Sequence, residues 1–276
     1  MVSTKKEIQN LEQYKTAFEQ QKTELTKSIR YAQNIQKAIF PQYGQFRNIF
    51  PDSFIFFKPR DIVSGDFYWV RQIRKKIIVA AGDCTGHGVP GAFMSILGII
   101  FLNEITNHEP LMPANRILNS LRERIMKTLN QTGKDSEQKD GMDISLLVYD
   151  RQYNTLDYSG ANTTLYHFRE KNLSEIKGDR MPIGINGVVE ESFQKKTIDI
   201  KKGDQIYVFT DGFVDQFGGE NSEKFKYKRF RKLFRDIQPY DFKKQEEILD
   251  KTFTNWKGDN EQVDDVLIIG IGFHAI

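Results

Sequence analysis

Residues 4–40 contain neither glycine nor proline and are rich in Gln, Lys and Glu. Apolar side chains recur at a strict seven-residue step, at Leu11, Phe18, Leu25, Ala32 and Ile39. This pattern is typical of a long amphipathic helix with half of a coiled-coil seam. Such a helix needs a partner surface, so we expect it to dimerise or to dock on the rest of the chain. Because Pro41 ends the pattern, we predict a linker helix over residues 1–40 and a globular domain over residues 41–276.

After Pro41 the chain changes to short β-rich runs separated by turn residues. The runs cover residues 54–57, 67–73, 76–81, 144–149, 155–159, 164–168, 193–200, 205–209 and 266–271. Helical patterns cover residues 91–107, 113–131, 223–237 and 242–256. Strand groups that enclose pairs of helices indicate an α+β sandwich of antiparallel sheets flanked by helices. Residues 91–102 are apolar on nearly all sides, which predicts a buried helix.

Composition and charge exclude several classes of protein. No run of eighteen apolar residues is present and the first ten residues lack an apolar signal core, so we expect neither membrane insertion nor secretion. The single cysteine, Cys84, excludes an internal disulfide framework and a cysteine-based zinc site, and suggests the reducing cytoplasm. Residues 1–40 hold seven basic and four acidic residues, which accounts for the whole net charge of +3. The remaining body is neutral overall, so nucleic-acid binding is not expected.

Four aspartates stand where predicted strands begin or end: Asp66, Asp83, Asp211 and Asp264. Taken singly, an aspartate beside a glycine is most often a turn residue. Several carboxylates that converge would repel one another unless a cation neutralised them. Oxygen ligands without cysteine indicate Mg²⁺ or Mn²⁺, and a pair of such ions can activate a water for in-line attack on phosphorus. The combination of the four positions therefore favours a metal site.

Longer motifs follow one another in the chain: SGDFYW (64–69), GDCTGHGVPGAFMS (82–95), YSGAN (158–162), MPIGI (181–185), GDQIYVFTDGFVDQFGG (203–219) and QVDDVLIIGIG (262–272). In this order they closely resemble the bacterial stage II sporulation protein E-like (SpoIIE/RsbU-type) branch of the metal-dependent type 2C serine/threonine protein phosphatases. The resemblance covers about residues 41–276. The preceding SIRYAQNIQKAIFP (28–41) is similar to the linker helix that precedes this domain in sensor proteins.

The resemblance implies a four-layer αββα sandwich with two Mn²⁺ or Mg²⁺ ions at one end. Carried over motif by motif, it implies five metal ligands: Asp66, Asp83, the main-chain carbonyl of Cys84, Asp211 and Asp264. Asp265 is expected behind Asp264, because neighbouring strand residues face opposite ways. Asp140 or Asp143 is a candidate for a weak third ion, although we favour a loop acid that faces solvent.

Arg60 lies six residues before the first of these aspartates. Related phosphatases use an arginine upstream of that aspartate to bind the substrate phosphate, and guanidinium geometry suits this role. The bacterial branch commonly lacks it, so a surface salt bridge is the alternative. His87 could act as a general acid, but a turn role is favoured between its two glycines. The basic segment 224–235 is interleaved with aromatic residues, which favours a solvated amphipathic helix over a nucleic-acid patch.

The implied function is a protein-serine/threonine phosphatase, a phosphoric monoester hydrolase. Metal-bound hydroxide would attack phosphoserine or phosphothreonine directly. The usual substrates in the family are anti-sigma-factor-antagonist (STAS-type) domains. The N-terminal helix would form a homodimer and pass on a signal from an upstream sensor domain or protein. The alternative is a catalytically weak regulatory module that binds a phosphoprotein through the same domain.

Overall fold

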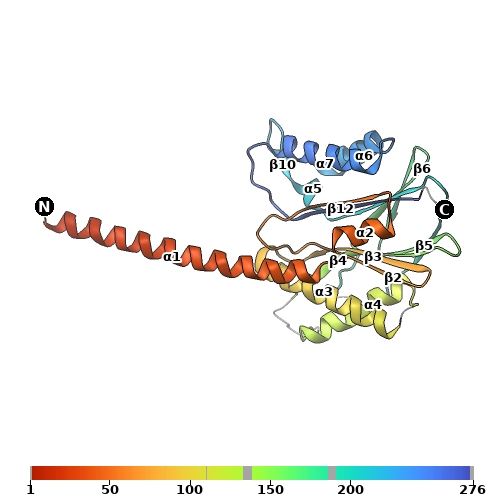
Figure 1. Ribbon diagram of the computed structural model, residues 1–276, viewed down its shortest axis with the longest axis horizontal. Helices are drawn as coiled ribbons and strands as arrows, with labels where there is room; N and C mark the ends of the chain where they lie inside the picture. Colours follow the sequence, from red (N-terminus) through yellow and green to blue (C-terminus); the bar gives the residue numbers. More distant parts are fainter. Residues whose placement is uncertain (1, 110, 133–138, 186–190, 274–276) are drawn as a thin grey trace.

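One long helix projects from a four-layer body in the computed structural model, which describes residues 2–109, 111–132, 139–185 and 191–273 (Figure 1). The helix is α1 (Val2–Ile39), and Phe40 follows it directly before Pro41. The body consists of two antiparallel sheets packed face to face, with helices on both outer faces. The predicted α+β sandwich preceded by a long helix is therefore confirmed.

The two sheets have five strands each. Sheet I has the spatial order β2 (Phe67–Ile73), β3 (Lys76–Cys84), β4 (Met142–Asp150), β5 (Thr155–Ala161) and β8 (Lys196–Asp199). Sheet II has the order β1 (Ser53–Lys58), β12 (Val266–Gly272), β9 (Gln205–Phe209), β6 (Thr164–Arg169) and β7 (Asn172–Lys177).

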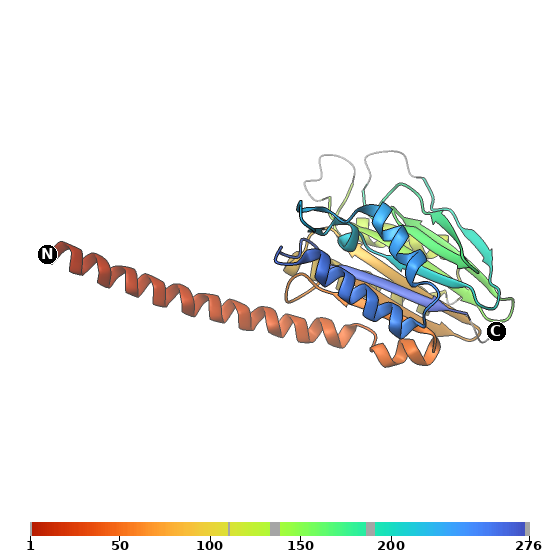
Figure 2. The same cartoon turned by 90° about the horizontal axis from the view of Figure 1, so that it is seen from above.

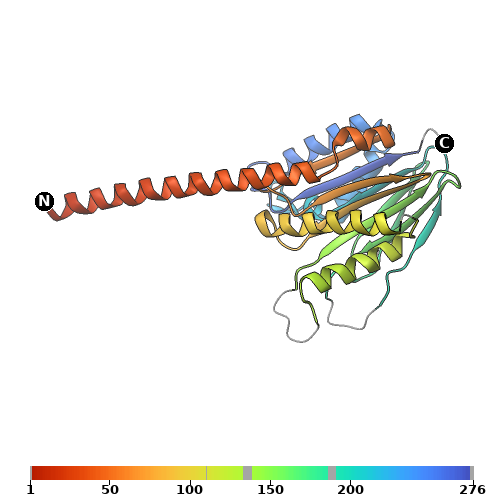
Figure 3. The ribbon, with the colours of Figure 1, turned by 60° about the horizontal axis from the view of Figure 1, so that its bottom comes forward.

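Helices cover the outer face of each sheet. Sheet II is covered by α6 (Lys226–Ile237) and α7 (Phe242–Lys257), drawn in blue (Figure 2). Sheet I is covered by α3 (Gly88–His108) and α4 (Ala114–Thr128), drawn in yellow and yellow-green (Figure 3). The shorter elements are α2 (Tyr43–Ile49), α5 (Gly212–Asp215) and the hairpin of β10 (Phe217–Gly218) and β11 (Glu223–Lys224).

Strand β12 shows why its sequence is a continuous apolar run. Leu267 and Ile269 lie in the cluster between the two sheets, whereas Val266 and Ile268 lie in the cluster under α6 and α7. Successive side chains of a strand point to opposite faces, so a strand with both faces covered is apolar at every position.

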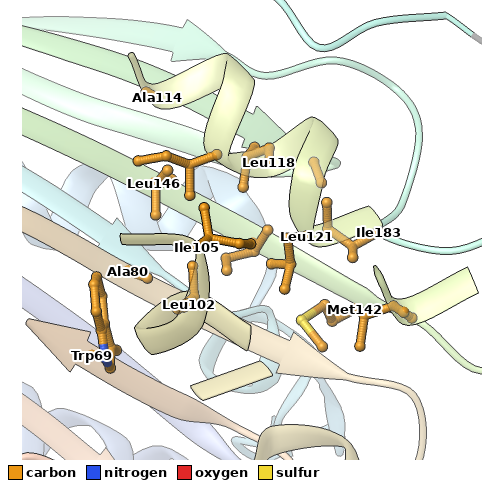
Figure 4. Close-up of a cluster of buried hydrophobic side chains, with 14 of the residues drawn as sticks. Trp69, Ala80, Leu102, Ile105, Ala114, Leu118, Leu121, Met142, Leu146 and Ile183 are labelled. Atoms are coloured by element: carbon orange, nitrogen blue, oxygen red, sulfur yellow. The ribbon is translucent and has the colours of Figure 1, made fainter. Parts of the chain in front are cut away.

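The layer of α3 and α4 packs on sheet I (Figure 4). Leu102 and Ile105 of α3 meet Leu118 and Leu121 of α4 in one buried cluster with Leu146 of β4. By length and composition alone α3 could cross a membrane. In this structure, however, its side chains Ile99, Leu102 and Ile105 are buried in the core between α3, α4 and sheet I.

The prediction that residues 91–102 are buried on nearly all sides is wrong in part. Phe93 and Ile100 are 66% and 46% exposed, because only one side of α3 faces the sheet and α4.

The predicted strands differ from the structure in two places, each for a local reason. Strand β7 was not predicted, because as the edge of sheet II it exposes most of its polar side chains and has no apolar run. The run 193–200 is a strand only from Lys196 onward. Phe193 leaves the sheet and is fully buried against α4, where its N–H donates to Asn119.

The heptad side chains of α1 remain largely uncovered in the single chain. Leu11, Phe18 and Leu25 are 68%, 66% and 62% exposed, and only the last turns of α1 dock on the body. Gln33 donates to the carbonyl of Ile62 there.

Candidate metal centre

Strand register brings the four predicted aspartates to one end of the sandwich. In sheet I, Phe67 pairs with Gly82, so Asp66 and Asp83 lie side by side where β2 begins and β3 ends. In sheet II, Ile268 pairs with Phe209, so Asp211 lies beside the start of β12, which Asp264 precedes by two residues.

A hydrogen bond links the two sheets at this end. Thr210 Oγ1 donates to Asp66 Oδ2 over 2.7 Å, and the same hydroxyl accepts from the N–H of Leu267 over 2.9 Å. Asp66 is only 1% exposed. The carboxylate of Asp66 is therefore fixed from the opposite sheet, and Thr210 is a site residue that was not predicted from the sequence.

The electrostatics show that these carboxyl groups are close together. Burial raises the pKa of Asp83 to about 8, and the charges of Asp211 and Asp264 add to the shift. Burial also raises the pKa of Asp66 well above its ordinary value, with the charge of Asp83 as the next cause. The pKa of Asp211 is raised to about 6 by burial and then by the charges of Asp215 and Asp264. Burial likewise raises the pKa of Asp264. The cluster thus holds excess negative charge that a cation would neutralise.

Asp265 braces the loop that carries Asp66. It is 2% exposed, and its two carboxylate oxygens accept from the N–H groups of Arg60 and Gly65, each over 2.7 Å. Bonds from backbone N–H groups to a buried carboxylate are among the stronger hydrogen bonds in proteins. Asp265 therefore acts on the position of the loop, in keeping with its expected place behind Asp264.

The side chain of Arg60 lies beside the cluster. Its Nη1 donates to the carbonyl of Val263 over 2.9 Å, and its charge lowers the pKa of Asp264 as a minor contribution. Among the described residues Arg60 forms no ion pair, so the alternative of a surface salt bridge is not found there, and the guanidinium bonds to main-chain oxygen. A role in binding phosphate stays a prediction.

The position of the Cys84 carbonyl suits its predicted role. The β2–β3 register places Gly65 opposite Cys84, and a Cβ added at Gly65 would lie 3.4 Å from that carbonyl oxygen. The N–H of Gly65 donates to Asp265, so Gly65 does not engage the carbonyl. The thiol itself is buried, and burial followed by the charges of Asp83 and Asp66 raises its pKa well above the ordinary value. A raised pKa keeps the thiol protonated, which does not favour Cys84 as a thiolate nucleophile.

Asp143 is not the solvent-facing loop acid that the sequence suggested. It is the second residue of β4 and pairs directly with Asp83 across β3 and β4. Burial raises its pKa, and Asn162 Nδ2 donates to its Oδ1 over 2.9 Å. Like charges directly opposite in a sheet destabilise it, so Asp143 adds to the demand for a cation. Asp140 lies just before the strand.

Close backbone approaches explain two of the motif glycines. A Cβ on Gly212 would lie 1.9 Å from the carbonyl oxygen of Asp265, and a Cβ on Gly91 would lie 2.2 Å from that of Gly86. No side chain fits either gap, so the aspartate loops are held together by direct backbone contact. His87 precedes α3, and its Nδ1 lies 2.8 Å from Asp61 Oδ2.

Across the described part of the chain, no three His, Cys, Asp or Glu side chains form a ready ligand set around one point. Mg²⁺ typically keeps several waters and takes only one or two carboxylates. Four aspartates exceed the carboxylates of one such ion and would fit a pair of ions, with Cys84 supplying a carbonyl oxygen. The residues present therefore suit hard divalent ions that retain part of their water shell.

Comparisons with known proteins agree with this geometry. The family model described as stage II sporulation protein E matches residues 74–274. A comparison with curated protein sequences gave no match. Among solved structures, the SiaA-PP2C domain of Pseudomonas aeruginosa is 30% identical, with a TM-score of 0.83, and the alignment covers 91% of this chain and 98% of that one.

Two more distant structures show the shared fold. The PP2C phosphatase domain of SpoIIE from Bacillus subtilis, with a fragment of its regulatory domain, is 18% identical with a TM-score of 0.63 and coverages of 82% and 63%. The RsbU and RsbW domains of a Mycobacterium tuberculosis protein are 16% identical with a TM-score of 0.62 and coverages of 81% and 60%. The chain therefore belongs to the stage II sporulation protein E family and has the fold of the PP2C phosphatase domains.

Proposed function

We propose that this chain is a metal-dependent phosphatase that hydrolyses phosphoserine or phosphothreonine on a signalling protein. The observation that carries the proposal is the convergence of Asp66, Asp83, Asp211 and Asp264, with raised pKa values, at one end of the sandwich. Membership of the family and the 30% identical PP2C domain support the same reaction.

The protein residues have separate tasks in this proposal. Asp66, Asp83, Asp211, Asp264 and the carbonyl of Cys84 would hold two Mn²⁺ or Mg²⁺ ions, and Asp143 would join a weaker third site. When bound, the ions would supply positive charge for the phosphoryl oxygens and acidify a water. Thr210 and Asp265 fix the Asp66 loop by the hydrogen bonds described above. Arg60 would bind a phosphoryl oxygen through guanidinium N–H groups that the Val263 carbonyl does not use.

The setting is proposed from the family motifs. The substrate would be an anti-sigma-factor antagonist of the STAS type. Residues 1–40 would act as an input linker and residues 41–276 as the catalytic domain, and the exposed heptad seam of α1 would pair with a second copy.

Hydrolysis of p-nitrophenyl phosphate by the full chain tests the proposal. We expect turnover that requires Mn²⁺, stops in EDTA and returns with added metal. Asp211→Asn should reduce turnover at least about 100-fold, since it removes a charge from the metal site. Asp236→Asn, the same change at an exposed position on α6, is the matched control and should keep activity. Turnover that persists in EDTA would refute the metal mechanism. Metal-independent binding of a phosphoprotein without turnover would favour the regulatory module.

A further inference from the structure

A concave site lies at the same end of the sandwich as the aspartates. Its volume is about 300 Å³, and it is lined by the β5–β6 turn, strands β6 and β7 and the first turns of α6. The turn residue Asn162 lines the site and bonds to Asp143, which places the site directly beside the candidate metal centre. Strand β7 ends at the same place, since Lys177 pairs with Thr164.

The wall of this site carries a buried hydroxyl that lies near Arg231 but has no well-formed hydrogen bond. Tyr166 is 1% exposed and lines the site, and its Oη makes no hydrogen bond of acceptable geometry. Burial raises the pKa of this hydroxyl, and the nearby guanidinium of Arg231 opposes the shift only as a smaller contribution. Buried polar groups in folded proteins are nearly always hydrogen-bonded, and leaving one unpaired costs about 1–3 kcal/mol. The hydroxyl is therefore available to a ligand that enters the site.

The charged side chains that line the site are three cations, Lys177, Arg180 and Arg231, and two carboxylates, Glu175 and Asp179, which leaves one positive charge in excess. Glu175 is held by Arg231, whose Nε lies 2.9 Å from Glu175 Oε1, although the N–H bond is not aimed at that oxygen. Asp179 accepts from the N–H of Gln194 over 2.8 Å. Within the described ranges, the exposed side chains of Lys177 and Arg180 have neither an ion pair nor a hydrogen bond. A site with one positive charge in excess, two exposed cations that form no ion pair and a hydroxyl without a well-formed hydrogen bond suits an anion.

We propose that this site binds an acidic side chain of the substrate protein, close in its sequence to the phosphorylated serine or threonine. The inference rests on the proposed phosphatase function and names a determinant of its specificity. A volume of about 300 Å³ accepts a Glu or Asp side chain but not a folded domain. Arg180 can bind a carboxylate with two parallel hydrogen bonds, and Lys177 adds a point charge.

Matched phosphoserine peptides test this inference with the full chain and Mn²⁺. A single Glu is placed in turn at each of the four positions on either side of the phosphoserine, and each peptide is compared with its Gln counterpart. We expect one position where Glu raises kcat/KM about tenfold, which corresponds to about 1.4 kcal/mol of transition-state stabilisation. Arg180→Ala should abolish this preference and leave p-nitrophenyl phosphate turnover unchanged. Lys171→Ala, an exposed lysine in the β6–β7 turn, should keep the preference.

Two results would overturn the inference. One is equal kcat/KM for Glu and Gln at every position. The other is a loss of p-nitrophenyl phosphate turnover in Arg180→Ala as large as the loss of peptide turnover, which would place Arg180 at the transferred phosphate. Binding of the same peptides to Asp211→Asn, followed by fluorescence anisotropy, does not depend on turnover. A Glu preference in binding that Arg180→Ala removes would support the site even if the wild type hydrolyses nothing, in which case only the proposed function fails.

Discussion

Asp83→Asn should stabilise the metal-free protein while it removes metal binding. Asp83 lies between Asp66 and Asp143 across the strands of sheet I, and its pKa is raised from 3.8 to about 8. A raised carboxyl pKa means that the folded state holds the proton more tightly than the unfolded state. This contribution is absent below about pH 4 and lowers the free energy of unfolding as pH rises toward about 8.

The size of the effect follows from the shift. Each pH unit between the ordinary pKa of 3.8 and pH 7 lowers the free energy of unfolding by about 1.4 kcal/mol. Over about three units, the carboxyl group at position 83 therefore costs about 4 kcal/mol of stability at pH 7. Asp83 is partly exposed, and water screens part of this cost, so we expect about 2 kcal/mol. The amide of the Asp83→Asn variant carries no charge and escapes the cost. A change of 1 kcal/mol shifts Tm by about 2–4 °C in a domain of this size, which predicts a rise of about 4–8 °C at pH 7 in EDTA.

Thermal unfolding from pH 5 to pH 8.5 in EDTA measures this effect. The wild type should lose stability as pH rises, whereas Asp83→Asn should follow a flatter curve. Asp236→Asn, an exposed position on α6, should follow the wild type. With Mn²⁺ at about 100 times its Kd the order should reverse, since binding stabilises the wild type by about 2.7 kcal/mol. Parallel pH curves for the wild type and Asp83→Asn in EDTA would refute the argument that the aspartates are crowded without a cation.

Two further changes test other parts of the structure. Asp265→Asn leaves one side-chain oxygen for the two N–H groups of Arg60 and Gly65. Urea unfolding should therefore show a free energy of unfolding lower by about 1–3 kcal/mol, and phosphatase activity should fall. An unchanged free energy of unfolding would contradict the role of Asp265 in holding this loop. Deletion of residues 1–28 removes Leu11, Phe18 and Leu25 of the seam, so light scattering should detect a monomer where the full chain is a dimer; a dimer that survives the deletion would move the interface into the body.

The sequence predicted the four aspartates because each lies in a motif beside an apolar strand: Asp66 and Asp264 just before one, Asp83 and Asp211 where one ends. Asp143 was placed wrongly, because the apolar run begins only at Ile144 and the pairing with Asp83 depends on a strand about sixty residues away in the chain. The same limit applies to Thr210 and Tyr166. Their roles depend on contacts between sheets, or between a strand and α6, that no local pattern encodes.

Helix α1 combines two surfaces that the heptad pattern alone does not separate. The seam is exposed at Leu11, Phe18 and Leu25, whereas Gln36 near the end of the helix is 5% exposed and bonds to the body through both its Nε2 and its Oε1. Gln36 Nε2 donates to the carbonyl of Ser64 over 2.6 Å and to Ser95 Oγ over 3.0 Å, and Gln36 Oε1 accepts from the N–H of Ser64 over 3.1 Å. Ser64 lies two residues before Asp66, so the end of α1, the start of α3 and the aspartate loop are joined by a single side chain. Because Gln36 lies beyond residue 28, deletion of residues 1–28 leaves these bonds in place. Self-association and support of the metal centre can therefore be measured separately.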